Sequence, residues 1–365
     1  VPVFSGGELR PSEKVKTAYK TSFVVHPDTA ASGCPYTWIG TVDGGKPHHA
    51  LITICDTGVV GRVDGSFVDP SRISKDAIFE GRTPPISPTK VLGPTIDIAI
   101  GYTPEVIGAN TWMLNRLAHP SPWPRMTSLA FMKATLQMAV DQTNAILGAS
   151  GVPARLQLAN TREFNNILEE SFADAQDAVQ SIAPGGTSDP YGVKAFRTNT
   201  GADLMSVWMY SNLKGEPHGA ADYGGAFSVV KSVKALGSTL TFAHEVAHNF
   251  GAHHPASQGD VGSSPGHARG YDGPGFYTIM SNGEGCDDPC LQVPYFSNPF
   301  VTIDPMTRNW SLTGAPAGHA STANNARRIW EESGRLAAFR TLKCPGSAPA
   351  GCGRAGPAWC RTSRC

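Results

Sequence analysis

The sequence predicts a mixed α/β (α+β) fold preceded by a β-rich segment, and three observations support this prediction. Residues 96–102 (IDIAIGY) and 203–210 (DLMSVWMY) are apolar runs with the length and composition of buried strands. Residues 128–147 instead repeat apolar side chains every three to four positions, as one face of a helix does. Near the N-terminus, short segments rich in β-branched and aromatic residues follow one another. Strands alternating with helices favour a layered α/β domain.

The N-terminal segments have the pattern of consecutive antiparallel strands. Residues 36–42, 49–55 and 58–63 are rich in β-branched and aromatic side chains, and Gly- and Asp-containing turns separate them. Such spacing predicts a β-meander.

A proline-rich stretch follows this meander and divides the chain. Residues 80–94 contain four prolines and few apolar side chains, so we expect an extended, exposed linker that ends near Gly93. A chain of 365 residues also exceeds what one core usually organises. We therefore predict a β-rich N-terminal segment at 1–93, a large domain at 94–343 and a Cys-rich tail at 344–365.

The large domain alternates strands and helices along the chain. We expect the helix at 128–147 to stop at Gly148 and Gly151, and a further helix to start at a capping Ser238 and run to about Phe250. The remaining predicted elements are strands at 156–159, 203–210 and 226–230, a helical region at 164–182 and a last helix at 320–342.

The charge balance excludes some classes of partner. Lys and Arg total 30, as do Asp and Glu, so no overall field favours nucleic acid or an acidic membrane surface. The longest uncharged apolar runs fall far short of the roughly 20 residues that span a bilayer. No charged-then-apolar leader precedes Val1, so we expect that a secretion signal has been removed.

The eight cysteines form three local groups, at 34 and 55, at 286 and 290, and at 344, 352, 360 and 365. No paired CxxC motifs that would suit a sulfur-ligated metal are present. We expect disulfides and an extracellular location, with local pairing because it closes the shortest loops.

The strongest chemical signal is the run from His244 to His254, HEVAHNFGAHH. His244 and His248 lie four apart on a predicted helix, so their imidazoles can converge on one metal ion. Gly251 can end the helix in the left-handed conformation, which lets His254 turn back as a third ligand. Three neutral ligands leave a zinc ion with an open position, where the pKa of a bound water falls to about 7.

Glu245 stands beside the first of these histidines and can take a proton from such a water. An HExxH pattern alone also arises by chance, on a solvated helix face or around a packed core histidine. The third histidine, spaced through a glycine, makes the metal site the favoured interpretation.

The pattern HExxHxxGxxH followed by a methionine turn, here residues 278–281 (TIMS), resembles the metzincin signature. Residues 241–251, 293–299 and 324–327 are similar to secreted bacterial reprolysin-like, adamalysin-related peptidases. The resemblance extends from about Ile96 to Arg340. It implies a zincin-like catalytic domain in which a twisted mixed sheet covers the active-site helix.

The resemblance also implies roles for residues outside the histidine run. Met280 would pack beneath the zinc-binding imidazoles without ligating; the alternative is ordinary core filling, and both roles can hold together. The segment from Met280 to Asn298 would form a wall of the pocket for the residue after the scissile bond. The strand near 219–227 would be the edge along which an extended substrate adds.

The chain departs from the family pattern at three positions. Pro255 follows the third histidine where adamalysins carry Asp, and Ala247 replaces the commoner Gly. Asn282 stands where serralysins and astacins place a Tyr ligand, so we assign no tyrosine to the metal. None of these changes removes a predicted ligand.

The N-terminal segment resembles the end of a propeptide, which would make this chain a proenzyme. A cysteine that blocks zinc, Cys34 or Cys55, is one hypothesis, and a structural disulfide between the two is the favoured one. Asp287 and Asp288 could contribute to a Ca²⁺ site, although solvated loop acids are the simpler interpretation.

Together these features predict a secreted zinc-dependent endopeptidase that acts on internal bonds of proteins or peptides, with Glu245 as general base. The competing hypothesis is a secreted binding protein that keeps zinc as a structural staple. Glu245 argues against it, because a staple has no use for this carboxylate. No oligomeric state follows from the sequence.

Overall fold

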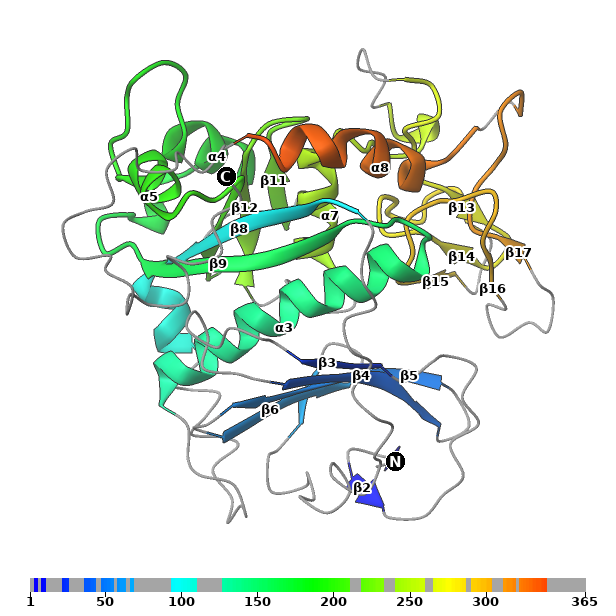
Figure 1. Ribbon diagram of the computed structural model, residues 1–365, viewed down its shortest axis with the longest axis horizontal. Coiled ribbons are helices and arrows are strands. Elements are labelled where there is room, and N and C mark those ends of the chain that lie inside the picture. Colours follow the sequence, from blue (N-terminus) through cyan, green and yellow to red (C-terminus); the bar gives the residue numbers. More distant parts are fainter. Residues whose placement is uncertain are drawn as a thin grey trace, which may run out of the picture.

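The computed structural model describes the main domain at residues 93–109, 127–210, 218–232, 240–259, 265–286, 290–303, 311–319 and 322–339, together with the strands of the N-terminal segment. Two sheets and a long helix between them dominate the architecture (Figure 1). No helix among these residues is both long and apolar enough to cross a membrane.

The central sheet has five strands in the order β11-β12-β10-β8-β9. Strands β8 (Thr95–Tyr102), β9 (Arg155–Glu163), β10 (Leu204–Met209) and β12 (Phe227–Lys231) run parallel, whereas β11 (Gly219–Ala221) pairs antiparallel to β12 at the edge. All six residues of β10 are buried, as a strand covered on both faces requires. The mixed α/β fold class is confirmed.

Helices cover both faces of this sheet. On one face, α3 (Ser128–Ala149) and α7 (Thr241–Asn249) contribute to a core that contains the side chains of Ile96, Ile98 and Ile100. On the other face, α4 (Ala175–Ile182) and α5 (Val193–Thr200) pack around Ala99, Met205 and Val207. Successive side chains of a strand point to opposite faces of the sheet, so Ile98 and Ile100 lie in one core and Ala99 lies in the other.

Several predicted helix boundaries were wrong. Gly148 lies inside α3, which continues to Ala149, and the left-handed Gly151 (φ 75°) follows the helix end. The region 164–182 contains only a short 3-10 helix, Glu169–Ser171, and α4. Asp174 starts α4 because its side chain accepts a hydrogen bond from the backbone N–H of Asp177 at 2.9 Å. The helix α5 was not predicted.

The C-terminal part of the domain consists mostly of loops and short strand pairs. These strands are β13 (Asp272–Gly273), β14 (Phe276–Tyr277), β15 (Leu291–Gln292), β16 (Thr302–Ile303) and β17 (Ser311–Leu312). Cys286 and Cys290 form the predicted local disulfide.

The last helix, α8 (Asn325–Leu336), is shorter than the predicted 320–342. Asn324 caps it by accepting a hydrogen bond from the backbone N–H of Arg327 at 2.9 Å. Ile329 and Leu336 anchor the helix in the same core as α3 and α7.

The N-terminal segment forms the predicted meander. Strands β3 (Ser22–Val25), β4 (Tyr36–Asp43), β5 (Pro47–Cys55), β6 (Gly58–Val63) and β7 (Ser66–Val68) pair antiparallel in this order. The strands β1 (Val3–Ser5) and β2 (Glu8–Arg10) form a separate pair.

This second sheet packs against α3, which therefore lies between two sheets (Figure 1). Leu51, Cys55 and Val60 belong to the same buried core as the residues of α3 and β8. The proline-rich linker up to Leu92 and the tail at 344–365 lie outside the described residues.

Candidate active site

The helix α7 presents His244 and His248 one turn apart, as their spacing predicts. The predicted start of this helix was wrong: α7 begins at Thr241, and Leu240 occupies the N-cap position without a side-chain cap. Leu240 has φ 48°, the left-handed conformation that residues other than glycine rarely adopt. Ser238 lies outside the described residues.

Gly251 ends the helix and redirects the chain toward His254. Its φ of 77° is left-handed, its N–H donates to the carbonyl of His248 at 2.8 Å, and the N–H of Ala252 donates to the carbonyl of Ala247 at 3.0 Å. This pattern of two hydrogen bonds around a left-handed glycine is a usual helix ending. The chain then turns back and brings His254 next to His244 and His248, as the sequence predicts.

The three predicted ligands meet at one point. The Nε2 atom of His244 lies 3.0 Å from that of His254, and the Nε2 atom of His248 lies 3.1 Å from each of the other two. Three nitrogens held tetrahedrally at about 2.0–2.1 Å from one Zn²⁺ would lie roughly 3.3–3.4 Å apart. The triad therefore has nearly the dimensions of a zinc site, and it is the one group of metal-ligating side chains found among the described residues.

Backbone carbonyls select the tautomer that a metal requires. The Nδ1 atom of His244 lies 2.8 Å from the carbonyl oxygen of Ile279, and Nδ1 of His248 lies 2.8 Å from that of Ala252. A carbonyl only accepts, so both Nδ1 atoms carry protons and both Nε2 atoms of neutral rings carry lone pairs. Lone pairs that converge within 3.1 Å repel one another unless a cation lies between them. The donor set thus fits a divalent metal.

Burial keeps these imidazoles neutral. It lowers the pKa of His244 to about 4, with a smaller contribution from His254, although the hydrogen bond to Ile279 acts in the opposite direction. Burial also lowers the pKa of His248 well below its usual value. Neutral imidazole is the form that binds metals.

Glu245 lies on the same helix, and its side chain is buried. The residue is only 4% exposed, and its Oε2 atom has no hydrogen-bond partner among the described residues. Burial raises the pKa of this carboxyl well above its usual value. A methyl group added at Gly219 of β11 would lie 2.7 Å from Oε1 of Glu245, so the edge strand passes directly over this side chain.

The methionine turn, residues 278–281, contacts the triad through a backbone hydrogen bond. The N–H of Ser281 donates to the carbonyl of Thr278 at 3.0 Å, and Met280 is fully buried in the core shared with α7. The residue before it, Ile279, supplies the carbonyl that binds His244. The turn thus fixes one histidine through the backbone.

Asn282, which follows this turn, is engaged in hydrogen bonds with two other polar side chains. Its side chain accepts from Gln258 and donates to Glu284 at 2.7 Å. Asp287 and Asp288, the predicted calcium candidates, lie outside the described residues.

Two residues near the triad, one against His248 and one bound to the neighbour of His254, were not predicted as site residues. Tyr223 places its ring 4.6 Å from that of His248, and Asn325 binds the backbone of His253 through its side chain. Both come from segments far from the motif in sequence. An exposed aromatic residue directly after the edge strand was the one signal that could have indicated Tyr223.

Comparison with known proteins agrees with this geometry. Residues 124–290 match the model of metallo-peptidase family M12, a span that includes all three histidines, Glu245 and Met280. A curated relative, the Peptidyl-Asp metalloendopeptidase of Stenotrophomonas maltophilia (strain K279a), is 32% identical over 221 residues, which cover 57% of this chain and 48% of the relative.

A second relative of the same name, from Xanthomonas campestris pv. campestris, is 38% identical over 220 residues, covering 57% of this chain and 47% of the relative. This chain therefore spans about half the length of the curated relatives it matches. The histidine triad, the methionine turn and the mixed sheet agree with the similarity of residues 124–290 to metallo-peptidase family M12 and with a metzincin-like metallopeptidase.

Proposed function

We propose that this chain is a zinc-dependent endopeptidase that hydrolyses internal peptide bonds of proteins, with Glu245 as general base. The observation that carries the proposal is the convergence of three histidine Nε2 atoms within 3.1 Å of one another beside a buried carboxylate. The M12 domain and the metalloendopeptidase relatives support the same activity.

His244, His248 and His254 would hold the zinc ion. When bound, Zn²⁺ supplies Lewis acidity, which polarises a substrate carbonyl and lowers the pKa of a coordinated water. The carbonyls of Ile279 and Ala252 keep two of the rings in the ligating tautomer. Such hydrogen bonds to the second ring nitrogen orient metal ligands and raise their basicity.

Glu245 would accept the proton of the attacking water and later deliver it to the departing amine. Its burial raises the carboxyl pKa, and a carboxylate with a raised pKa is a stronger base. A metal cation nearby would act in the opposite direction and keep the group ionised before the reaction.

The edge strand β11 would bind the substrate backbone. β11 pairs with β12 on one side and is the last strand of the sheet, so its other side can accept an extended peptide. Its residues Gly219, Ala220 and Ala221 have small side chains or none, which leaves room for the substrate next to Glu245. Met280, beneath the triad, would only support the ligands.

The competing function, a binding protein with a structural metal, accounts less well for Glu245. A buried carboxylate with an unsatisfied oxygen costs stability unless it has another use. General-base catalysis is such a use, whereas a structural staple is not.

We further propose that the protein is secreted, and that residues 1–93 form a propeptide-like segment before a catalytic domain at 94–343. The Cys286–Cys290 disulfide supports an oxidising location. Cys55 is disulfide-bonded, which argues against this residue as a thiolate that blocks zinc. Cys34, the other candidate, lies outside the described residues.

The name of the relatives suggests a substrate class. Both are called Peptidyl-Asp metalloendopeptidases, so we propose that this chain also prefers scissile bonds next to aspartate. Matched peptides that differ only by Asp or Asn at the cleavage position would test this preference. Equal cleavage of the two would contradict it.

The activity itself is tested on a casein zymogram and with a quenched peptide. We expect cleavage that a zinc chelator abolishes and that added Zn²⁺ restores. Cleavage that persists in the metal-free protein would contradict the proposal, as would no cleavage by zinc-loaded protein that stays folded after residues 1–93 have been removed.

A further inference from the structure

A turn at residues 222–225, which follows the edge strand, is bound to the C-terminal end of α7. The N–H of Gly224 donates to the carbonyl of His248 at 2.9 Å. The side-chain amide of Asn249 donates to the carbonyl of Asp222 at 3.2 Å and to that of Phe227 at 3.0 Å. Two consecutive residues of the metal-binding helix therefore hold both ends of this turn.

The turn carries Tyr223, whose ring packs against two histidines. It meets the ring of His248 edge-on, with centroids 4.6 Å apart and an interplanar angle of 71°. It stacks on the ring of His253, with centroids 4.6 Å apart and planes within 7° of parallel. Tyr223 is 50% exposed, so it lies between a predicted metal ligand and solvent.

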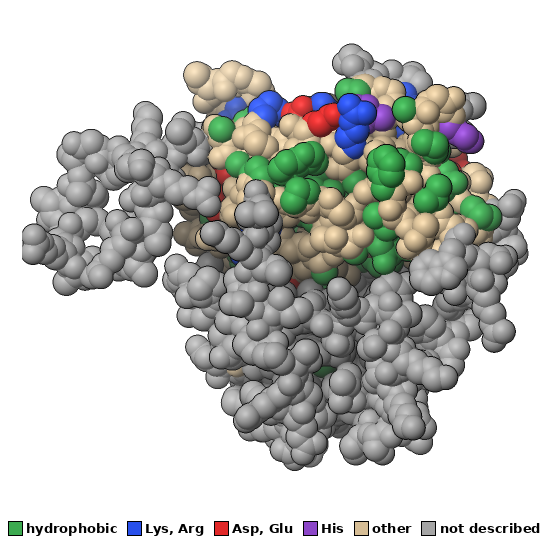
Figure 2. Space-filling model, turned by 45° about the vertical axis from the view of Figure 1, so that its right-hand side comes forward, with side chains coloured by type: hydrophobic (Ala, Val, Ile, Leu, Met, Phe, Trp, Pro, Cys, Tyr) green, Lys and Arg blue, Asp and Glu red, His purple; other side chains and the backbone are tan. Residues whose placement is uncertain are grey.

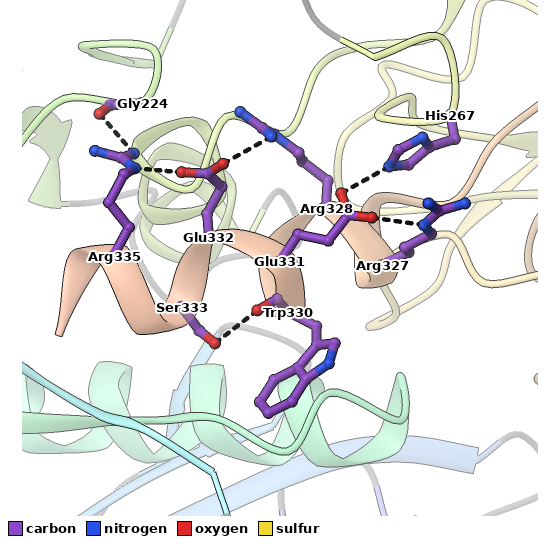
Figure 3. Close-up of polar contacts among 9 residues, drawn as sticks. All are labelled: Gly224, His267, Arg327, Arg328, Trp330, Glu331, Glu332, Ser333 and Arg335. Atoms are coloured by element: carbon purple, nitrogen blue, oxygen red, sulfur yellow. Dashed lines mark hydrogen bonds and ion pairs between the residues drawn. The ribbon is translucent and has the colours of Figure 1, made fainter.

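A chain of charged residues on α8 connects the turn with the end of α7 (Figure 3). Arg335 donates to the carbonyl of Gly224 at 3.0 Å and pairs with Glu332. Glu332 also pairs with Arg328 at 2.8 Å. The guanidinium of Arg328 would lie 2.9 Å from a methyl group added at Gly251, so it covers the glycine that ends α7.

These charged residues belong to an exposed band of both signs. Figure 2 shows acidic and basic side chains next to one another along the upper edge of one face, where Figure 1 places α8. Glu332 is only 16% exposed, whereas Arg335 is 44% exposed. Partial burial protects the Glu332 carboxylate, which pairs with both arginines, from full screening by solvent.

We propose that Tyr223 is a positioning residue for the metal ligand His248, and that Arg335 of α8 latches its turn in place. The ring of His248 is already fixed at Nδ1 by the carbonyl of Ala252. Tyr223 closes a second side of the same ring, so His248 cannot swing away from the metal unless the turn moves. The latch therefore slows metal loss. The inference rests on the metal site of the proposed function.

The test measures zinc release from the full-length chain into an excess of a chromophoric chelator. Tyr223→Ala should release zinc at least about tenfold faster than the unaltered chain, the scale typical of groups that orient metal ligands. Tyr223→Phe keeps the ring and should release zinc at nearly the original rate. The visible spectrum of the Co²⁺-substituted Ala variant should also change, because the spectrum reports ligand geometry.

Arg335→Ala tests the latch separately, with Arg327→Ala as its matched control. Arg327 forms a similar ion pair on the same helix, at 2.7 Å to Glu331, but it binds no part of the turn (Figure 3). We expect faster zinc release only in Arg335→Ala. Because both residues act through one turn, adding Arg335→Ala to the Tyr223→Ala variant should accelerate zinc release little further.

A third control removes an exposed aromatic side chain elsewhere. Trp330 is 44% exposed and points away from the charged chain on α8 (Figure 3). Trp330→Ala should leave zinc release unchanged.

The outcomes separate this inference from the proposed function. If the unaltered chain binds zinc and cleaves peptides, but Tyr223→Ala with an unchanged metal-free melting temperature releases zinc at the original rate, the inference is wrong and the function stands. Should Tyr223→Ala fail to fold, the exposed Arg335→Ala decides, and release equal to that of Arg327→Ala overturns the latch. Failure of the unaltered chain to bind zinc overturns both.

Discussion

At the scale of single residues, Gly219 sets the distance between the edge strand and Glu245. A methyl group there would lie 2.7 Å from Oε1 of Glu245 and 2.8 Å from the backbone carbonyl of Val229. The carboxylate can move, but the carbonyl belongs to the neighbouring strand and cannot. Any side chain at this position must therefore displace either β11 or the proposed general base.

Gly219→Ala should accordingly lower kcat/KM by at least about tenfold, since a small misplacement of a catalytic group has large effects on rate. Gly148→Ala is the matched control, because no atom lies within 4 Å of the added methyl group and the site is helical. Peptide cleavage by both variants checks the prediction. Equal rates would show that Glu245 tolerates a shifted edge strand.

The buried histidines predict how the metal-free protein responds to acid. Burial lowers the pKa of His244 from 6.5 in the unfolded chain to about 4. The unfolded state binds this proton more readily, so the contribution is complete above pH 6.5 and is lost as the pH falls toward 4. At pH 5 the loss is on the order of 2 kcal/mol.

Urea unfolding of metal-free protein at pH 7.5 and pH 5 measures this loss. His244→Gln cannot titrate, so its free energy of unfolding should fall less between the two pH values than that of the unaltered chain. An identical fall in both proteins would mean that His244 is protonated in the native state at pH 5.

The sequence predicts His244, Glu245, His248 and His254 as site residues because their proposed chemistry depends on spacing along one helix and one turn. Their neighbours in space were not accessible in this way. Tyr223 reaches the site only through the packing of the edge strand on α7, a contact that no local pattern encodes.

At the scale of elements, the start of α8 holds together two segments next to the candidate active site. Asn325, fully buried, donates to the carbonyl of His253 at 3.0 Å and accepts from its N–H at 3.3 Å. The N–H of Asn325 donates to Ser297 at 2.8 Å. One residue at the start of α8 thus connects the chain next to the third histidine with the segment after the methionine turn.

Asn325→Ala should lower the free energy of unfolding by about 1–3 kcal/mol, because it removes two buried hydrogen bonds to the backbone of His253, which keeps its bonds to Ala268 and Gly270. It should also weaken zinc binding, since His254 follows directly. Asn160→Ala removes an exposed amide that binds only its neighbour Thr161 and should stay within about 0.5 kcal/mol of the original. Chemical denaturation and zinc titration would detect both effects. A stable Asn325→Ala variant with full zinc affinity would contradict this role.

Element prediction succeeded for the two most apolar strands, placed the end of β9 four residues too early, and failed at helix ends. The runs at 96–102 and 203–210 are mostly apolar, so β8 and β10 were predicted within one residue. The start of α7 was wrong, since Leu240 occupies the N-cap with a rare backbone conformation that packing must stabilise. Helix α5 was missed because left-handed glycines at both ends, Gly192 and Gly201, bound only eight residues.

At the scale of the whole molecule, α3 links the N-terminal sheet to the core that contains α7. Most of its length is buried, which agrees with a helix that lies between two sheets. Its sequence pattern predicted one apolar face, but not the second sheet that covers it. Contact between sheets and helix depends on the path of the linker, which local sequence does not determine.

Because the core is continuous, a cavity in the N-terminal sheet should destabilise the catalytic domain. Leu51→Ala should cost about 2–5 kcal/mol and lower the melting temperature in a single transition, whereas Leu51→Met, of similar volume, should cost less than about 1.5 kcal/mol. Scanning calorimetry of the full-length chain checks this. Two separate transitions, with only the first affected, would show that the two parts fold independently.

The central claim, that the triad and Glu245 form a peptidase site, is tested most directly by comparing Glu245→Gln with His254→Ala. Zinc content is measured by atomic absorption and cleavage with a quenched peptide. Glu245→Gln should keep one zinc per chain yet lose roughly 10²- to 10⁴-fold in activity, as expected for a general base. His254→Ala should lose zinc affinity, and its melting temperature should no longer respond to chelator. Undiminished cleavage by zinc-loaded Glu245→Gln would contradict the account.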